Sequence, residues 1–214
     1  VGIKKVALEL GGKSPNIILD DADLPTAVAR GMLHMANNTG QSCNAPSRML
    51  VPAAKLAEAE ALAAATVAKI KVGDPENAET TMGPLANEAQ FGRVQKMIQR
   101  GIDEGAKVVA GGVGKPAGLE AGYFAQPTIF SNVNNQMDIA RQEIFGPVLC
   151  MIPYNGIDEA VRIANDTPYG LSGYVYAATP EAAGVIAAKL RTGNVHLNGA
   201  GGDNAAPFGG YKQS

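Results

Sequence analysis

The sequence predicts an α/β fold with a mostly parallel, twisted sheet. Short segments rich in β-branched residues alternate with longer segments that have the periodicity of amphipathic helices, and this alternation runs along the 214 residues. Such alternation is typical of parallel strands joined by helical connections. No internal repeat, linker or low-complexity segment interrupts it, so we expect one domain over residues 1–214.

In the first half of the chain, apolar periodicity and turn residues place the elements. Asp23 is a suitable N-cap, and Pro25 lies in the first turn of the helix that follows it, where proline is tolerated. Apolar residues repeat at helical spacing from Leu24 to Met35, and the turn-rich residues 37–40 end this helix. The other predicted elements are strands at 6–10, 16–19 and 49–51 and a helix over 53–70.

In the second half, a helix predicted over 87–104 ends before Gly105, a residue suited to the left-handed conformation that follows many helices. The glycine-rich segments 111–122 and 199–210 lack periodicity and are predicted to be loops. The remaining predicted elements are strands at 107–110, 148–152, 174–177 and 194–197 and helices over 157–165 and 180–190.

Composition argues against several classes of function. The net charge is −2 and no basic stretch is interleaved with aromatic residues, so we expect no nucleic-acid partner. No apolar run approaches the roughly 18 residues that a membrane span needs, and no signal peptide opens the chain. The two cysteines make no disulfide framework and favour a reducing, cytoplasmic setting. His34 and His196 belong to no spaced cluster, so no metal site is expected.

Two glycine-rich motifs resemble nucleotide-binding sequences but lack what these need. The motif at 12–14 has no glycine five positions earlier, and Pro15 blocks the helix that a P-loop requires. The segment 112–117 follows a predicted strand, but Pro116 prevents the helix that a dinucleotide fingerprint must open. We therefore expect no complete dinucleotide-binding unit within this chain.

The two cysteines differ in their surroundings. Cys43 lies in a polar turn between a helix and a strand, whereas a structural cysteine normally has apolar neighbours. Cys150 is flanked by apolar residues in a predicted strand, and we expect it in the core. A reactive thiol needs exposure and neighbours that favour the thiolate, so Cys43 is the candidate nucleophile, with a structural role as the alternative.

Two glutamates are candidates for a catalytic or ligand-binding role. Glu9 is the only charge in an apolar segment, and apolar surroundings that disfavour a charged carboxylate suit it to act as a general base. The alternative is a glutamate on the wet face of an edge strand. Glu143 lies among glycine and proline residues, where its carboxylate could accept hydrogen bonds from two neighbouring hydroxyls, such as those of a ribose. Its alternative is a surface charge at a helix end.

Four motifs together resemble the aldehyde dehydrogenase family, in the family's order and spacing. Glu9 and Cys43 are 34 positions apart, as the base and the nucleophile of that family are. The resemblance covers essentially the whole chain and implies a three-layer catalytic domain over 1–214, with a hinge strand over 1–10 that carries Glu9. The motifs lie at 8–15, 40–44, 142–148 and 207–214.

The resemblance implies that an aldehyde is oxidised to a carboxylic acid with NAD or NADP. Cys43 would add to the aldehyde as a thiolate, and the resulting thiohemiacetal would lose a hydride to the nicotinamide and become a thioester. The backbone N–H of Cys43 is a candidate donor to the oxyanion. Glu9 would then deprotonate the water that hydrolyses the thioester, and no metal is required.

Other residues take their roles from the same resemblance. Glu143 would bind the hydroxyls of the nicotinamide ribose, and Phe145 would lie beside the nicotinamide. The backbone of Leu10 would contact the carboxamide of the nicotinamide. Ser42 and Asn44 would flank the substrate pocket.

The resemblance also implies a longer parent protein. The sequence opens on Val1 and ends on Ser214 without a tail, while the family's Rossmann-type domain would lie upstream and its oligomerisation strand downstream. We therefore expect these residues alone to have little or no dehydrogenase activity, and the parent to be a homodimer or homotetramer. Residues of the upstream Rossmann-type domain would determine whether the enzyme binds NAD or NADP.

Two other functions are compatible with these motifs. In a CoA-acylating aldehyde dehydrogenase, CoA would take the acyl group, but Glu9 argues against this because it serves attack by water. A non-catalytic scaffold would not need to keep Cys43, Glu9 and Glu143 together. The resemblance places the loop 198–206 in the substrate pocket. Here this loop is small and glycine-rich, so we expect a roomy or mobile pocket for aliphatic or aromatic aldehydes; it has no arginine to pair with a carboxylate, and its Asp203 would favour a cationic aldehyde.

Overall fold

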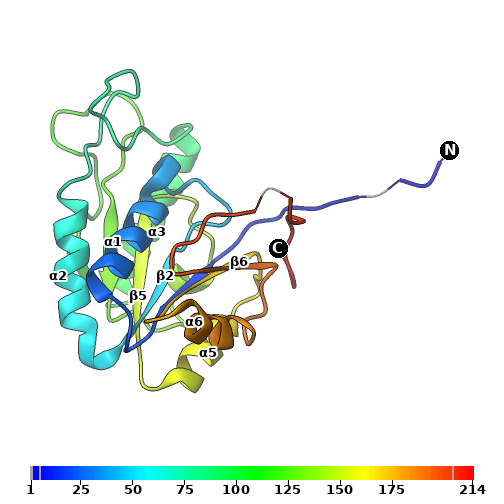
Figure 1. The fold of residues 1–214 in the computed structure, drawn as a ribbon. Helices are drawn as coiled ribbons and strands as arrows, with labels where there is room; N and C mark the ends of the chain where they lie inside the picture. The colour runs from blue at the N-terminus through cyan, green and yellow to red at the C-terminus, as the bar shows by residue number, and fades with distance from the viewer. Residues whose placement is uncertain (1, 5, 204) are drawn as a thin grey trace.

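The computed structural model describes residues 2–4, 6–203 and 205–214. The strands are β1 (Pro15–Ile18), β2 (Arg48–Pro52), β3 (Lys107–Ala110), β4 (Thr128–Ser131), β5 (Val148–Tyr154), β6 (Ser172–Tyr176) and β7 (Asn194–Leu197). They form one sheet in the order β3-β4-β5-β2-β1-β6-β7, in which β3 runs antiparallel to β4 and all other neighbours are parallel. This confirms the predicted α/β fold with a mostly parallel sheet (Figure 1).

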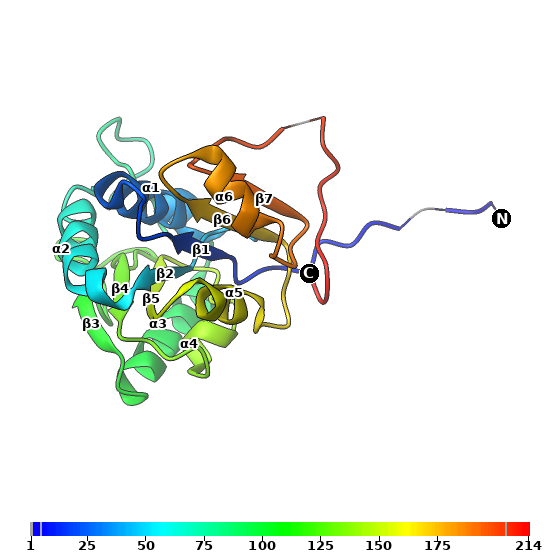
Figure 2. The same ribbon diagram turned by 60° about the horizontal axis from the view of Figure 1, so that its bottom comes forward.

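Helices cover both faces of this sheet, so the domain has three layers, as expected (Figure 2). The helices are α1 (Leu24–Ala36), α2 (Leu56–Val67), α3 (Glu88–Asp103), α4 (Asp138–Arg141), α5 (Ile157–Asn165) and α6 (Pro180–Ala187), with short 3-10 helices η1 (Asn37–Gly40) and η2 (Ala53–Lys55). Buried side chains of α1 and α2 form one core, and those of α3 to α6 form a second core on the opposite face.

Successive residues of the central strands face opposite layers. Ile17 of β1 and Leu50 of β2 belong to the core under α3 to α6, whereas Ile18 and Met49 belong to the core under α1 and α2. Side chains alternate across a strand, and both faces are covered here, so the central strands are apolar at almost every position. Cys150 of β5 is fully buried, as predicted.

The ends of two helices follow their capping residues. The carboxylate of Asp23 accepts hydrogen bonds from the backbone N–H of Thr26 at 3.4 Å and from its hydroxyl at 2.6 Å. Asn87 caps α3 by accepting from the backbone N–H of Gln90 at 2.9 Å, and Gly105 follows this helix with a φ of 84°. Both helices therefore begin where their N-caps predict.

The prediction of a strand over 6–10 is wrong. These residues pair with no strand in the described part of the chain, and Figure 1 shows their segment extending away from the sheet. Val6, Leu8 and Leu10 are 79%, 64% and 57% exposed. Alternating apolar residues give the sequence pattern of a strand, but a strand also needs a hydrogen-bonding neighbour, which the described residues do not supply. Val1 and Lys5 of the predicted hinge lie outside the described residues.

The sequence prediction missed two short elements, β4 and α4, each of four residues. Four residues are too few to show a clear period, and only pairing with β3 and β5 defines β4 as a strand. The helix predicted over 53–70 begins as η2 and continues as α2, which ends at Val67. Among the described residues, no helix has the length and apolarity required to cross a membrane.

Candidate active site

Three loops meet at the amino-terminal edge of the sheet. Residues 9–13 lead into β1, residues 41–47 into β2 and residues 143–147 into β5, and these three strands are parallel. The strands are also neighbours in the sheet, so the loops that precede them lie close together. Open α/β sheets usually bind ligands at the opposite, carboxyl-terminal edge, and the strand order alone would have misplaced this site.

The loops enclose an open cleft of about 670 Å³. All seven residues that the sequence singled out for catalysis, cofactor binding or the substrate pocket line this cleft. Two further residues, Gly11 and Gln41, line it too; they are next to candidate residues within the motifs and were not singled out. The lining residues are Glu9, Leu10, Gly11, Gln41, Ser42, Cys43, Asn44, Glu143 and Phe145.

Glycines allow the three loops to touch through their backbones. A Cβ atom on Gly12 would collide with the carbonyl oxygen of Cys43, and one on Gly11 would collide with the carboxylate of Glu143. A Cβ atom on Gly40 would collide with the carbonyl oxygen of Gly146. The close approach of these loops therefore depends on the absence of side chains at these glycines.

A turn with left-handed backbone conformation connects α1 to the loop that carries Cys43. Asn38 and Thr39 have φ values of 51° and 58°, a conformation that few residues other than glycine adopt. The amide of Asn38 donates to the carbonyl of Gln41 at 2.8 Å, and the hydroxyl of Thr39 donates to the carbonyl of Gly83 at 3.0 Å. These bonds hold the strained turn in place and fix the direction in which the loop enters the cleft.

The thiol of Cys43 is protonated at neutral pH in this structure. Its pKa is raised to about 11, first by burial and then by the hydrogen-bonding and the negative charge of the neighbouring Glu9 carboxylate. The backbone N–H groups of Cys43 and Asn44 oppose this effect, because they donate to the sulfur. The expectation that the neighbours of Cys43 favour the thiolate is therefore wrong for these residues, since the nearest charge is negative.

Glu9 lies against Cys43 but is itself exposed. The apolar surroundings expected for this carboxylate are not found among the described residues, because the alternating leucines and valine of its segment are exposed as well. What the structure does provide is contact between the carboxylate and the thiol. This contact allows direct proton transfer from sulfur to oxygen.

Glu143 is half-buried in the same cleft, with one oxygen engaged. Its Oε1 accepts a hydrogen bond from the backbone N–H of Gly12 at 3.0 Å. Burial raises the pKa of Glu143, while the Gly12 N–H and the nearby Arg93 lower it. The second oxygen remains available to an outside donor. Phe145 follows closely in a left-handed conformation with φ 55° and is 37% exposed, so its ring is presented to the cleft.

The comparisons with known proteins agree with this geometry. The model of the aldehyde dehydrogenase family matches residues 1–214. The chain belongs to the aldehyde dehydrogenase family. It is 63% identical over 212 residues to a 3-succinoylsemialdehyde-pyridine dehydrogenase from a Pseudomonas species, covering 99% of this chain and 44% of that protein.

Solved aldehyde dehydrogenases share the fold of this domain. A mutant of aldehyde dehydrogenase C from Pseudomonas syringae, in complex with NAD+ and octanal, superimposes with a TM-score of 0.97 at 56% identity, over 99% of this chain and 44% of that one. An aldehyde dehydrogenase from Mycobacterium tuberculosis with NAD+ gives a TM-score of 0.94 at 44% identity, over 96% and 42%. The chain thus spans less than half the length of these relatives.

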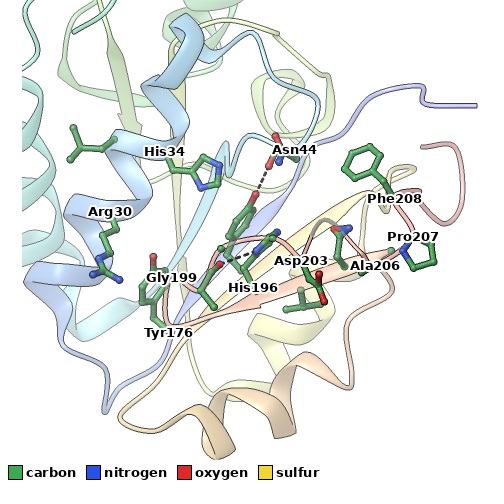
Figure 3. Close-up of a pocket in the computed structure, with 18 residues that line it drawn as sticks. Arg30, His34, Asn44, Tyr176, His196, Gly199, Asp203, Ala206, Pro207 and Phe208 are labelled. Atoms are coloured by element: carbon green, nitrogen blue, oxygen red, sulfur yellow. Dashed lines mark hydrogen bonds between the residues drawn. The ribbon is translucent and has the colours of Figure 1, made fainter.

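A second pocket adjoins the cleft of this aldehyde dehydrogenase domain. It has a volume of about 1170 Å³ and shares Asn44 with the cleft (Figure 3). His34 and His196, far apart in the sequence, both line it. The loop 198–206, which was expected to form part of a roomy pocket, supplies one wall of it, whereas the walls from α1, β6 and β7 were not predicted from the sequence. Among the described residues, no group of three or more His, Cys, Asp or Glu side chains could hold a metal ion.

The substitution Gly40→Ala should destabilise the domain by about 3 kcal/mol, because it combines a left-handed φ of 70° with a collision against Gly146. Gly105→Ala is the matched control, since Gly105 has a φ of 84° but open space around its Cα. We expect that control to cost about 1–2 kcal/mol. Urea unfolding of both variants measures the difference, and equal losses would show that the contact with Gly146 contributes nothing.

Proposed function

We propose that this chain is the catalytic domain of an NAD(P)-dependent aldehyde dehydrogenase that oxidises an aldehyde to a carboxylic acid. One observation carries the proposal: the carboxylate of Glu9 lies beside the thiol of Cys43 and raises its pKa, in a cleft that Glu143 and Phe145 also line. A nucleophile next to a base is the arrangement that covalent catalysis requires.

In the proposed first step, Glu9 takes the proton of the Cys43 thiol, and the thiolate adds to the aldehyde carbon. The carbonyl oxygen becomes an oxyanion, which needs donors already in position. The backbone N–H groups of Cys43 and Asn44 lie at the sulfur and are the available donors in this loop. The thiohemiacetal then becomes a thioester on Cys43 as the carbon is oxidised.

In the second step, water hydrolyses the thioester. Glu9 first releases to solvent the proton that it took from the thiol. It then accepts a proton from the water as the water oxygen attacks the acyl carbon, and it passes this proton to the Cys43 thiolate, which is the leaving group. The exposure of Glu9 suits this step, because the carboxylate must be reached by water and must exchange its proton with solvent. The acid is released, and the thiol and carboxylate return to their starting state.

The residues of the cleft fit the nicotinamide end of NAD, which would accept the hydride when bound. The free oxygen of Glu143 can accept a hydrogen bond from a ribose hydroxyl, and the exposed ring of Phe145 offers a flat surface beside it. The backbone of Leu10 also lines the cleft, where it could contact the carboxamide. Structures of two relatives were obtained with NAD+, which supports NAD as the cofactor here.

We further propose that a cofactor-binding domain outside these residues completes the enzyme, and that the complete protein is a homodimer or homotetramer of the cytoplasm. The chain spans 44% of its relative, and it offers contacts to the nicotinamide end alone. We expect an NAD titration of the 214-residue chain to show little binding; tight binding would contradict this. One relative is named for a pyridine-bearing semialdehyde, and the structure of another contains octanal. These two aldehydes differ widely beyond the aldehyde group, so they support an aldehyde as the substrate without specifying the rest of the molecule.

The alkylation rate of Cys43 tests the pairing with Glu9. Because the pKa of Cys43 is about 11, its alkylation by iodoacetamide should rise about ten-fold per pH unit from neutral pH to near pH 11. Mass spectrometry should locate the label on Cys43 and leave the buried Cys150 unmodified, and Cys43→Ser should remove it. Addition of an aldehyde should protect Cys43 through the thiohemiacetal; absence of protection by any aldehyde would contradict the proposed function.

A further inference from the structure

The pocket beside the Cys43 cleft is walled by aromatic rings. The ring of Tyr174 stacks on His196 with centroids 4.8 Å apart and planes 12° apart, and His34 meets it edge-on at 5.1 Å and 85°. Tyr174 is 3% exposed, so its position is fixed by these neighbours. All three rings line the pocket, and Figure 3 shows His34 on α1 and His196 on β7.

A hydrogen bond connects these rings to the loop that carries Cys43. The hydroxyl of Tyr174 donates a hydrogen bond to the backbone carbonyl of Asn44 at 2.9 Å (Figure 3). Asn44 follows Cys43 in the sequence and lines both the cleft and the pocket. A molecule whose carbonyl group lies at Cys43 can therefore extend into the pocket past Asn44.

The chemistry of the lining favours a flat ring over an alkyl chain. Among the described lining residues, only Leu33 and Val195 contribute aliphatic side chains larger than alanine or proline, and Leu33 is 52% exposed at the rim. Burial, and next the neighbouring His196, lower the pKa of His34, so this ring is neutral at pH 7. A neutral imidazole stacks against an aromatic ligand without first losing a hydration shell.

The charges around the pocket disfavour a cationic ligand. Arg30, one turn before His34 on α1, lines the pocket and forms no ion pair with any described residue. Its Nη1 donates a hydrogen bond to the backbone carbonyl of Asn198 at 3.3 Å. The carboxylate of Asp203, expected from the sequence to favour a cationic aldehyde, instead accepts a hydrogen bond from the backbone N–H of Ala205 at 2.9 Å. A guanidinium group beside rings attracts the face of another ring.

We propose that the pocket walled by His34, Tyr174 and His196 binds the part of the substrate beyond its aldehyde group and selects uncharged aryl aldehydes over alkyl aldehydes. This inference rests on the proposed function, because it takes Cys43 to be the point of attack. It names the substrate class by its ring, which would stack on the partly exposed imidazoles of His34 and His196.

The chain is well suited to a direct test, because its two histidines both line this pocket. In the Cys43→Ser variant, which keeps binding non-covalent, benzaldehyde and hexanal are titrated while the histidine ring protons are followed by NMR. We expect benzaldehyde to shift both histidines through its ring current and to bind roughly ten-fold more tightly than hexanal. Equal affinities, or no histidine shift with benzaldehyde, would overturn the inference.

A second variant keeps the test independent of folding. His196 is partly exposed, so His196→Leu should fold, lose the preference for benzaldehyde and bind hexanal as tightly or more so. An undiminished preference for benzaldehyde would also overturn the inference. Protection of the intact Cys43 thiol from alkylation is measured in parallel with both aldehydes. If neither aldehyde protects Cys43, the proposed function fails, whereas equal protection by both with no histidine shift rejects only the aryl selectivity.

Discussion

Replacing Glu9 by glutamine is expected to change two rates in opposite directions. The carboxylate raises the pKa of Cys43 by its hydrogen bond and its charge, so Glu9→Gln should lower that pKa and accelerate alkylation at pH 8. Burial is the larger cause of the raised pKa and remains, so the gain should be roughly three- to ten-fold. Hydrolysis of an acyl group on Cys43 should instead slow by about 10² to 10⁴, the usual contribution of a general base.

Both rates can be measured on the 214-residue chain. p-Nitrophenyl acetate acylates the thiol without a cofactor, and mass spectrometry follows the decay of acetyl-Cys43, while iodoacetamide reports the thiolate. Glu143→Gln is the matched control, because Glu143 lines the same cleft but does not contribute to the pKa of Cys43. If Glu9→Gln and Glu143→Gln give the same two rates, Glu9 is neither the proton acceptor nor the base.

Replacing Arg48 by methionine is expected to lower the free energy of unfolding by about 3–5 kcal/mol, as is typical when one member of a buried polar network is removed. Arg48 is fully buried in β2. Its Nε donates to the carbonyl of Lys13 at 2.9 Å, and its Nη atoms donate to Asn135 at 2.8 Å and to the carbonyls of Ile163 and Ala164 at 2.9 Å. Arg48→Met would remove the guanidinium donor from all four acceptors.

The position of Arg48 explains why so costly a side chain is buried. The carbonyls of Ile163 and Ala164 belong to the last turn of α5, where the helix dipole is negative and the Ile163 carbonyl accepts only a long hydrogen bond, at 3.3 Å, from the backbone N–H of Asp166. Burial lowers the pKa of Arg48 to about 10, so it stays charged at neutral pH and satisfies this helix end. It also ties the loop that carries Glu9 to the core.

Urea unfolding measures the loss, with Arg162→Met as the control. Arg162 lies on α5, but its side chain is 67% exposed and contacts Glu159 on the surface. We expect this control to change the free energy of unfolding by less than about 0.5 kcal/mol. A loss below about 1 kcal/mol for Arg48→Met would mean that water or rearranged side chains replace the guanidinium.

Local sequence signals predicted most of the fold, because they act over a few residues. Asp23 caps the helix that it was expected to cap, and the apolar segments at β2, β5 and β7 became strands. The failure at 6–10 has a different origin. A strand is defined by its neighbour, and alternation of Val6, Leu8 and Leu10 cannot supply one.

The sequence by itself determined which residues meet in the cleft, because Glu9, Cys43 and Glu143 stand in motifs whose spacing marks the family. Only the tertiary structure determined the protonation state of Cys43 and which side chains lie beside the cleft. Cys43 is a protonated thiol because folding buries it next to Glu9, and the His34–Tyr174–His196 wall joins side chains from three elements. Both features arise from contacts between residues that are distant in the chain, and the energies of such contacts depend on burial and distance, which no local pattern records.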